Sequence, residues 1–178
     1  MSLPHALLTA LIEHPGSGLE LASRFDRSIG YFWQATHQQI YRELGRLEVA
    51  GWVKSEPVEQ SRGKKKTYRV LPAGRKELKR WIQERVDTEP IRREMLVRLR
   101  AEAAVGPTNL QAAFKDFIAL REEKLAFYRR IQDRDFSGNL DSRQRQLHHL
   151  VLKAGIAHET MWLDVAREAS QILSSPQD

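Results

Sequence analysis

The sequence contains no cysteine, and this absence excludes several kinds of site. Without cysteine there is no disulfide framework, thiolate metal site or thiol nucleophile, and the composition suits a reducing compartment. A long apolar run is also missing. The apolar opening "MSLPHALLTALI" has no cationic segment before it, and Glu13 follows too early for a membrane span. We therefore expect a cytoplasmic protein that neither enters a membrane nor is exported.

The sequence also lacks the known catalytic and metal-binding patterns. It has no GxGxxG motif, P-loop or nucleophile elbow, and no pair of carboxylates in a recognisable context. His148, His149 and His158 lie on one predicted helix, but "HETMW" lacks the second histidine of the HExxH zinc motif. We expect no enzymatic activity, no metal and no other cofactor.

The positive charge of the chain is concentrated in its first half. The net charge is +6 over 178 residues, of which 41% are apolar and 29% charged. Residues 1–86 contain 15 Lys and Arg against 9 Asp and Glu, whereas the remaining residues contain 14 of each. This asymmetry predicts a basic module that contacts a polyanion, joined to a neutral module with another role.

The first half has the pattern of three short helices followed by a β-hairpin. The third helix is predicted to begin at Thr36, which forms a capping box with Gln39, and to end at Gly51. Its apolar positions Ile40, Leu44 and Leu47 form one core-facing stripe. Two strands, "WVKSEPV" and "KTYRVL", then flank the basic turn "SRGKKK". This order is typical of a winged helix-turn-helix, whose third helix enters the major groove of DNA while the hairpin lies along the backbone.

The predicted third helix has a polar face opposite its apolar stripe, with Gln38, Arg42, Gly45 and Val49 at its centre. Glutamine and arginine side chains can pair with base edges, and Thr36 or Tyr41 can contact a thymine methyl or a phosphate. Cations on the hairpin tip would release counterions from phosphates, which adds affinity without sequence preference. The predicted DNA-binding residues are Thr36, His37, Gln38, Gln39, Tyr41, Arg42, Arg46, Arg62, Lys64, Lys65, Lys66 and Thr67.

The second half is predicted to be entirely helical. A helix beginning at Pro72 is interrupted near Pro90, so we divide the chain into domains 1–88 and 89–178. In the last helix, roughly 141–173, apolar residues recur alternately every four and three positions, as in a coiled-coil seam. The long helices cannot bury such broad apolar faces on each other alone, and a second copy is the simplest partner. The predicted dimerisation residues are Leu147, Leu150, Val151, Ala154, His158, Met161, Trp162 and Val165, of which Trp162 could also line a small-molecule pocket.

Two segments carry a resemblance to a known family. "GYFWQATHQQIYRELGRLEVAGWVKSE" and "SRGKKKTYRVLPAGRKELKRWI" resemble the PadR family of bacterial transcription regulators, and the later helices look like the larger C-terminal domain of its Vir-type (AphA-like) members. The resemblance implies a homodimeric winged-helix DNA binder, usually a repressor, whose C-terminal helices dimerise and can form an effector site. It places the DNA-facing part at residues 36–46, the wing at residues 62–68, and Tyr41 at a position that often faces the DNA backbone.

The fold class expected from these observations is mainly α, with an N-terminal winged helix-turn-helix, a β-hairpin wing and a C-terminal helical dimerisation domain. The expected function is that of a sequence-specific transcriptional regulator, a homodimer and a repressor. Its expected partners are a palindromic operator in double-stranded DNA, a second copy and an unidentified small-molecule effector. The alternative is a winged-helix protein-interaction module that uses its cations to bind an acidic protein and has no DNA affinity.

Overall fold

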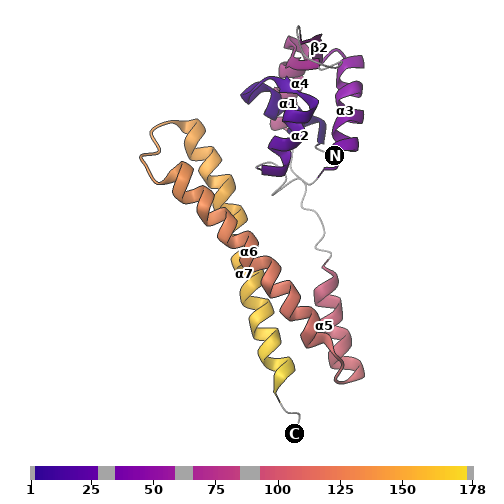
Figure 1. Cartoon of the computed structure of the whole chain (residues 1–178), viewed down its shortest axis with the longest axis vertical. Coiled ribbons are helices and arrows are strands. Elements are labelled where there is room, and N and C mark those ends of the chain that lie inside the picture. Colours follow the sequence, from indigo (N-terminus) through magenta and orange to yellow (C-terminus); the bar gives the residue numbers. More distant parts are fainter. Residues whose placement is uncertain (1–2, 28–34, 59–65, 85–92, 176–178) are drawn as a thin grey trace. The chain divides into compact units, whose positions relative to one another are not determined.

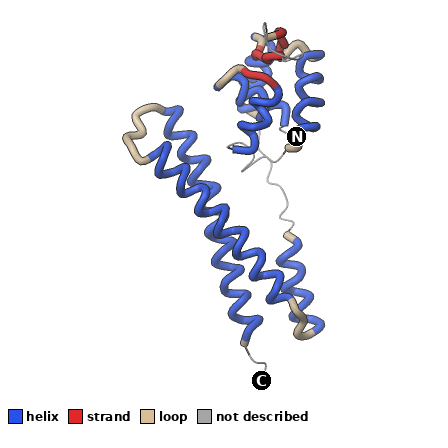
Figure 2. The backbone as a smooth tube through the Cα atoms, viewed as in Figure 1, coloured by secondary structure: helices blue, strands red, loops and turns tan. Residues whose placement is uncertain are grey.

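The computed structural model describes residues 3–27, 35–58, 66–84 and 93–175, and it divides into two compact units, Met1–Thr88 and Glu89–Asp178. Helices make up most of the described chain and the strands are short and confined to the first unit (Figure 2). The predicted fold class, mainly α with a winged helix, is therefore confirmed. Among the predicted DNA-binding residues, Arg62, Lys64 and Lys65 lie outside the described residues.

The first unit contains four helices and three strands in its described part. The helices are α1 (Leu3–Glu13), α2 (Gly18–Arg27), α3 (His37–Val49) and α4 (Pro72–Ile82). The strands are β1 (Gly16–Ser17), β2 (Val53–Pro57) and β3 (Lys66–Val70), arranged in the order β1-β3-β2 with antiparallel neighbours.

The predicted apolar stripe of α3 anchors that helix in the core of the first unit. Ile40 and Leu44 are 0% exposed and Leu47 is 2% exposed, and they pack in one cluster with residues of α1, α2, β2 and α4. The predicted capping box is present, because Thr36 Oγ1 accepts a hydrogen bond from the Gln39 amide at 3.2 Å and Gln39 Oε1 accepts one from the Thr36 amide at 2.8 Å. Gly51, with φ of 69°, follows the helix in the left-handed conformation that glycine favours.

The predicted hairpin is also present, with a third strand that the sequence pattern did not predict. β2 and β3 pair in register from Val53 opposite Val70 to Pro57 opposite Lys66. β1 pairs with the other edge of β3, which places Gly16 opposite Tyr68 and Ser17 opposite Thr67. A two-residue strand of glycine and serine has no apolar alternation, so no periodic pattern in the sequence indicates it.

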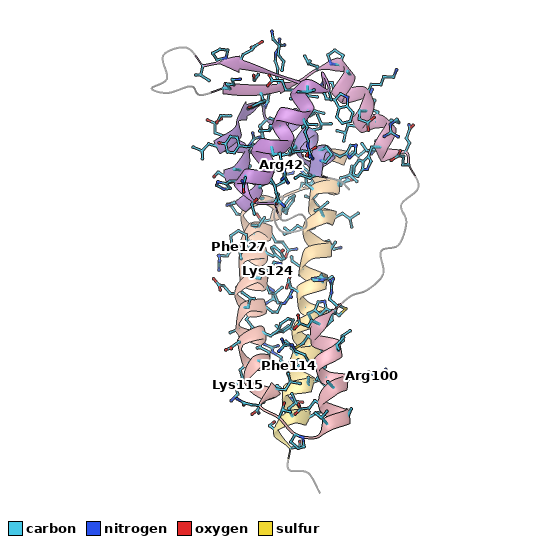
Figure 3. The ribbon with its side chains drawn as sticks, turned by 90° about the vertical axis from the view of Figure 1, so that its right-hand side faces the viewer. Arg42, Arg100, Phe114, Lys115, Lys124 and Phe127 are labelled. Atoms are coloured by element: carbon cyan, nitrogen blue, oxygen red, sulfur yellow. The ribbon has the colours of Figure 1, made fainter. Side chains whose placement is uncertain are left out.

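The second unit consists, in its described part, of α5 (Glu94–Val105), α6 (Leu110–Phe136) and α7 (Arg143–Ser174). α6 and α7 lie side by side as an antiparallel pair, and α5 lies beside the end of the pair at which α6 begins (Figure 1). At that end Phe114, 1% exposed, lies among the helices (Figure 3) and packs with Ala166, Ala169, Met95 and Leu99.

A buried carboxylate joins the two long helices near their middle. Glu159 of α7 is 2% exposed, and its oxygens lie 2.6 Å from Arg121 Nη1 and 2.9 Å from Lys124 Nζ, both on α6. Burial alone would raise the pKa of Glu159, but the hydrogen bonds and charges of Lys124 and Arg121 outweigh it and hold the pKa below its usual value. Burial, together with the charge of Glu159, raises the pKa of the nearby Tyr128 hydroxyl to about 12.

In the described part of the chain, none of the helices combines the length and apolar character needed to cross a membrane.

Replacing Glu159 with glutamine should destabilise the second unit, because Arg121 and Lys124 would keep their charges at a site that has lost its anion. We expect a loss of about 1.5–3 kcal/mol in the free energy of unfolding, since both cations retain some access to water. Urea denaturation at pH 7 measures it.

The matched control is Glu122→Gln, which removes an exposed ion pair between the same helices, Glu122 with Arg167 at 2.6 Å. This change should cost less than about 1 kcal/mol. The pKa of Glu159 is lowered in the folded state. Its ion pairs therefore stabilise the fold fully at pH values above the ordinary glutamate pKa of 4.5, and this stabilisation declines as the pH falls below that value. The free energies of unfolding of wild type and Glu159→Gln should therefore become more similar in acid. Equal losses of unfolding free energy from Glu159→Gln and Glu122→Gln at pH 7 would contradict this account.

Candidate nucleic-acid interface and C-terminal pocket

The outer face of α3 is open to solvent. Gln38 and Arg42 are exposed, Val49 is 92% exposed, and a side chain built at Gly45 would meet nothing within 4 Å. Figure 3 labels Arg42 in the first unit. These four positions share one face because the buried stripe occupies the opposite side of the helix. The Gln38 amide and the Arg42 guanidinium can therefore contact another molecule.

Several other predicted residues of α3 have contacts within the protein. The side chains of Thr36 and Gln39 cap the helix, and Arg46 Nη1 lies 3.2 Å from Glu43 Oε2. His37 is exposed at the first turn. The cap uses one hydrogen bond to the side-chain oxygen of each capping residue, and so Thr36 and Gln39 also fix the start of α3.

Tyr41 is half exposed, at 48%, and its ring lies against the start of α2. A Cβ atom built at Gly18 would be 2.4 Å from Tyr41 Cε1 and 3.0 Å from Cζ. The aromatic ring therefore lies directly on the backbone of Gly18. The sequence reading identified Tyr41 but not its contact with Gly18, because the two residues are far apart in sequence and no local pattern links them.

The strand part of the wing carries both cations and an acid. Lys66 is exposed and Thr67 is partly buried. Glu56 of β2 lies 3.3 Å from Lys54 Nζ and 3.0 Å from Arg69 Nη2, and these two cations lower the pKa of the Glu56 carboxyl. The run of residues 61–71 contains no acid, yet the register of the hairpin brings one to Arg69 from the neighbouring strand. Arg69 is therefore partly neutralised within the protein.

A second acid that the sequence reading missed joins α3 to the hairpin. Glu48 accepts a hydrogen bond at 2.9 Å from the backbone amide of Ser55 in β2. Hydrogen bonds with Ser55, assisted by the charge of Lys66, lower the pKa of Glu48. The contact fixes the hairpin relative to the C-terminal half of α3.

The predicted dimerisation residues divide into two groups on α7. Leu147, Leu150, Val151 and Met161 are 48–61% exposed, and Ala154 and His158 are also exposed. We call these six residues the α7 stripe. Trp162 is 8% exposed, with its ring 6.5 Å from that of Phe117 in α6, and Val165 is partly buried beside α5. Trp162 is covered within the chain by Phe117 of α6, and Val165 lies beside α5, which the spacing on α7 alone did not reveal.

An open pocket of about 420 Å³ lies beside the covered tryptophan. Its walls are the aromatic rings of Phe117 and Trp162, with Met95. Three arginines also line it: one on α5, one on α6 and one immediately before α5. The Arg121 guanidinium lies 4.6 Å from the centre of the Phe117 ring, and its Nε atom is buried without a hydrogen-bond partner among the described residues. The lining residues are Arg93, Glu94, Met95, Arg98, Phe117, Arg121 and Trp162.

Both units of the chain match known protein families. Residues 7–80 match the "Transcriptional regulator PadR-like family", and residues 91–174 match "Virulence activator alpha C-term". The "Probable transcriptional regulator Rv1176c" of Mycobacterium tuberculosis is 42% identical, over 96% of this chain and 98% of the relative. The "Negative transcriptional regulator PadR" of Bacillus subtilis is 29% identical, over 70% of this chain and 69% of the relative.

Solved structures share the fold over nearly the full length. Bacillus subtilis PadR in complex with operator DNA has a TM-score of 0.82 at 23% identity, and covers 98% of this chain and 100% of that one. The same protein in complex with p-coumaric acid has a TM-score of 0.77 at 23% identity, with the same coverage. The Vibrio cholerae virulence activator AphA has a TM-score of 0.79 at 27% identity, and covers 97% of this chain and 98% of that one.

These matches agree with the expectation that the chain is a regulator and not an enzyme. The winged helix, the family match over the first unit and the full-length relative together show that this chain belongs to the PadR-like family of transcriptional regulators.

Proposed function

We propose that this regulator is a homodimeric repressor that binds a palindromic operator in double-stranded DNA through α3 and the wing. The observation that carries the proposal is the solvent-exposed outer face of α3, which presents Gln38 and Arg42 opposite a fully buried apolar stripe. Bacillus subtilis PadR supports the proposal in two ways: it is named a negative transcriptional regulator, and its structure, which has the same fold, is in complex with operator DNA.

Within this proposal the exposed residues have different tasks. Gln38 and Arg42 contact base edges from the N-terminal two turns of α3, where recognition helices approach the major groove most closely. Lys66, with Arg62, Lys64 and Lys65 of the wing tip, contacts phosphates and supplies affinity that does not depend on sequence. Glu56 does not oppose this role because Lys54 and Arg69 neutralise it.

Dimerisation would use the α7 stripe, whose apolar members are exposed in the protomer. The stripe extends over four turns, a length of about 21 Å, along one side of α7. A second copy is the occupant we propose, because a stripe that pairs with itself across a two-fold axis would match the symmetry of a palindromic operator. The half-sites would then lie about one helical turn of DNA apart.

A small-molecule effector is a second proposal, supported by the pocket of the second unit. Its two aromatic walls and its arginines suit a flat ligand that carries an anionic group, because the rings can stack on the ligand and a guanidinium can bind a carboxylate. A structure of the same fold contains p-coumaric acid, which is such a molecule.

Substitutions on α3 and on the wing should affect DNA binding differently. Arg42→Ala should weaken binding to the operator and relax the base preference at one pair by roughly 1–3 kcal/mol. Replacing Lys64, Lys65 and Lys66 together by alanine should weaken binding to all sequences and reduce the slope of log affinity against log salt by roughly two to three per protomer. Salt-titrated binding measures both effects, with a duplex that the wild-type protein selects from a random pool and with a scrambled duplex.

The two outcomes that count against the proposal are distinct. If the slope of log affinity against log salt stays the same in the triple lysine variant, the wing does not contact the phosphates. Absence of duplex binding by the wild-type protein at low salt, combined with binding to an acidic protein, would select the alternative of a protein-interaction module.

A charge placed in the α7 stripe should separate the dimer. Val151→Glu puts a carboxylate among apolar side chains that would be buried between two copies, where an unpaired charge is costly. We expect the mass in sedimentation equilibrium to fall from that of a dimer toward 20.6 kDa at low micromolar concentration. Lys153→Glu, exposed on α7 outside the stripe, is the control and should remain dimeric. A Val151→Glu variant that stays dimeric would place the interface elsewhere.

Calorimetric titration with p-coumaric acid tests the pocket. Arg98→Ala removes a guanidinium from the lining and should weaken binding by about tenfold or more, the typical effect of losing a hydrogen bond between charged groups. Arg100→Ala, on the same helix but absent from the lining, should bind as the wild type does (Figure 3). Equal affinities for all three proteins, or no heat of binding with any of them, would contradict the proposal for this ligand.

A further inference from the structure

The contact between Gly18 and Tyr41 joins the start of α2 to the outer side of α3. A Cβ at position 18 would lie 2.4, 3.0 and 3.1 Å from three atoms of the Tyr41 ring, which is closer than carbon atoms approach without displacement. The ring is therefore seated on a backbone that has no side chain to hold it away. Only glycine permits this contact.

Neither backbone conformation nor core packing explains the glycine. Among the described glycines a positive φ occurs at Gly51 and Gly106, so the backbone at Gly18 is one that other residues also adopt. Tyr41 is 48% exposed, whereas the core-facing residues of α3 are at most 2% exposed, so its ring fills no part of the core. The contact instead fixes the direction of an exposed aromatic side chain.

The backbone under the ring is itself firmly held. Ser17, the residue before Gly18, is 3% exposed and pairs with Thr67 of β3. Its amide donates to Glu20 Oε2 at 2.8 Å and its hydroxyl accepts from the Glu20 amide at 3.3 Å, which closes the first turn of α2. The segment that supports Tyr41 thus also pairs with β3, a strand of the wing.

We propose that Gly18 is a positioning residue for DNA binding: it lets the Tyr41 ring lie on the start of α2, in a fixed direction relative to Arg42 and to β3. This inference depends on the proposed function of α3 as the DNA-binding helix. Its physical basis is preorganisation, because a side chain that is already held in its bound direction loses less conformational entropy when the duplex binds. The Tyr41 hydroxyl, a donor and an acceptor, is the group that would reach the duplex.

The substitution Gly18→Ala should disturb this position without unfolding the protein. Tyr41 can rotate about its side-chain torsions into solvent, because half of its surface is already exposed, and the core residues stay where they are. The variant should melt within a few degrees of the wild type. It should nevertheless bind the selected duplex about tenfold more weakly, and Tyr41→Ala should have the same effect, which corresponds to losing roughly one hydrogen bond to a phosphate.

A double-variant cycle separates positioning from a general structural effect. If Gly18 acts through Tyr41, then Gly18→Ala combined with Tyr41→Ala should bind no more weakly than Tyr41→Ala alone. Gly138→Ala is the matched control, since it is the same substitution at a glycine of the second unit where, unlike at Gly18, an added Cβ would meet nothing within 4 Å. It should leave the affinity unchanged.

Each other result contradicts the inference. Gly18→Ala binding as tightly as the wild type, or losses that multiply in the double variant, would show that Gly18 does not act through Tyr41. If Gly18→Ala lowers the melting temperature markedly, adding Tyr41→Ala must restore it. A melting temperature that stays low in the double variant would show that the alanine at position 18 clashes with a group other than Tyr41. A wild-type protein that binds no duplex would overturn the proposed function together with this inference, whereas normal binding by wild type and Gly18→Ala alike would overturn the inference alone.

Discussion

The packing of one apolar stripe fixes the candidate interface. Ile40, Leu44 and Leu47 are almost completely buried, so α3 has one possible rotation about its axis in this unit. Once that rotation is set, Gln38 and Arg42 must face solvent, because they lie on the other side of the same helix. The exposure of this face of α3 is thus a consequence of core packing, and no separate interaction is needed to expose it.

Polar contacts between secondary-structure elements hold α3 and its neighbouring segments in place. The capping box closes its first turn, Glu48 ties its last turns to Ser55 of β2, and β1 connects the start of α2 with β3. These contacts make the helix, the hairpin and the Tyr41 ring parts of one framework. A DNA-binding surface benefits from such a framework because groups that are already aligned lose less entropy on binding.

Local sequence patterns predicted much of this unit and less of the other. The period of Ile40, Leu44 and Leu47, the Thr36 cap and the two strands follow from short-range spacing, and the structure confirms all three. The pairing of Glu56 with Arg69 required the register of the hairpin, which the sequence did not define. In the second unit the period on α7 indicated an apolar seam but not that α5 and α6 cover Trp162 and Val165. The buried Glu159 was missed because one acid in a helix looks like any exposed acid until its neighbours are known.

Cross-linking to DNA tests the central claim most directly, which is that the outer face of α3 contacts bases. Duplexes selected by the wild-type protein, with 5-iodouracil at single positions, would be irradiated and the attached peptides identified by mass spectrometry. The account predicts attachment within His37–Val49, at His37 or Tyr41 before any other residue, and at positions related by the two-fold symmetry of the site. Attachment confined to residues 93–175, with none on α3, would contradict it.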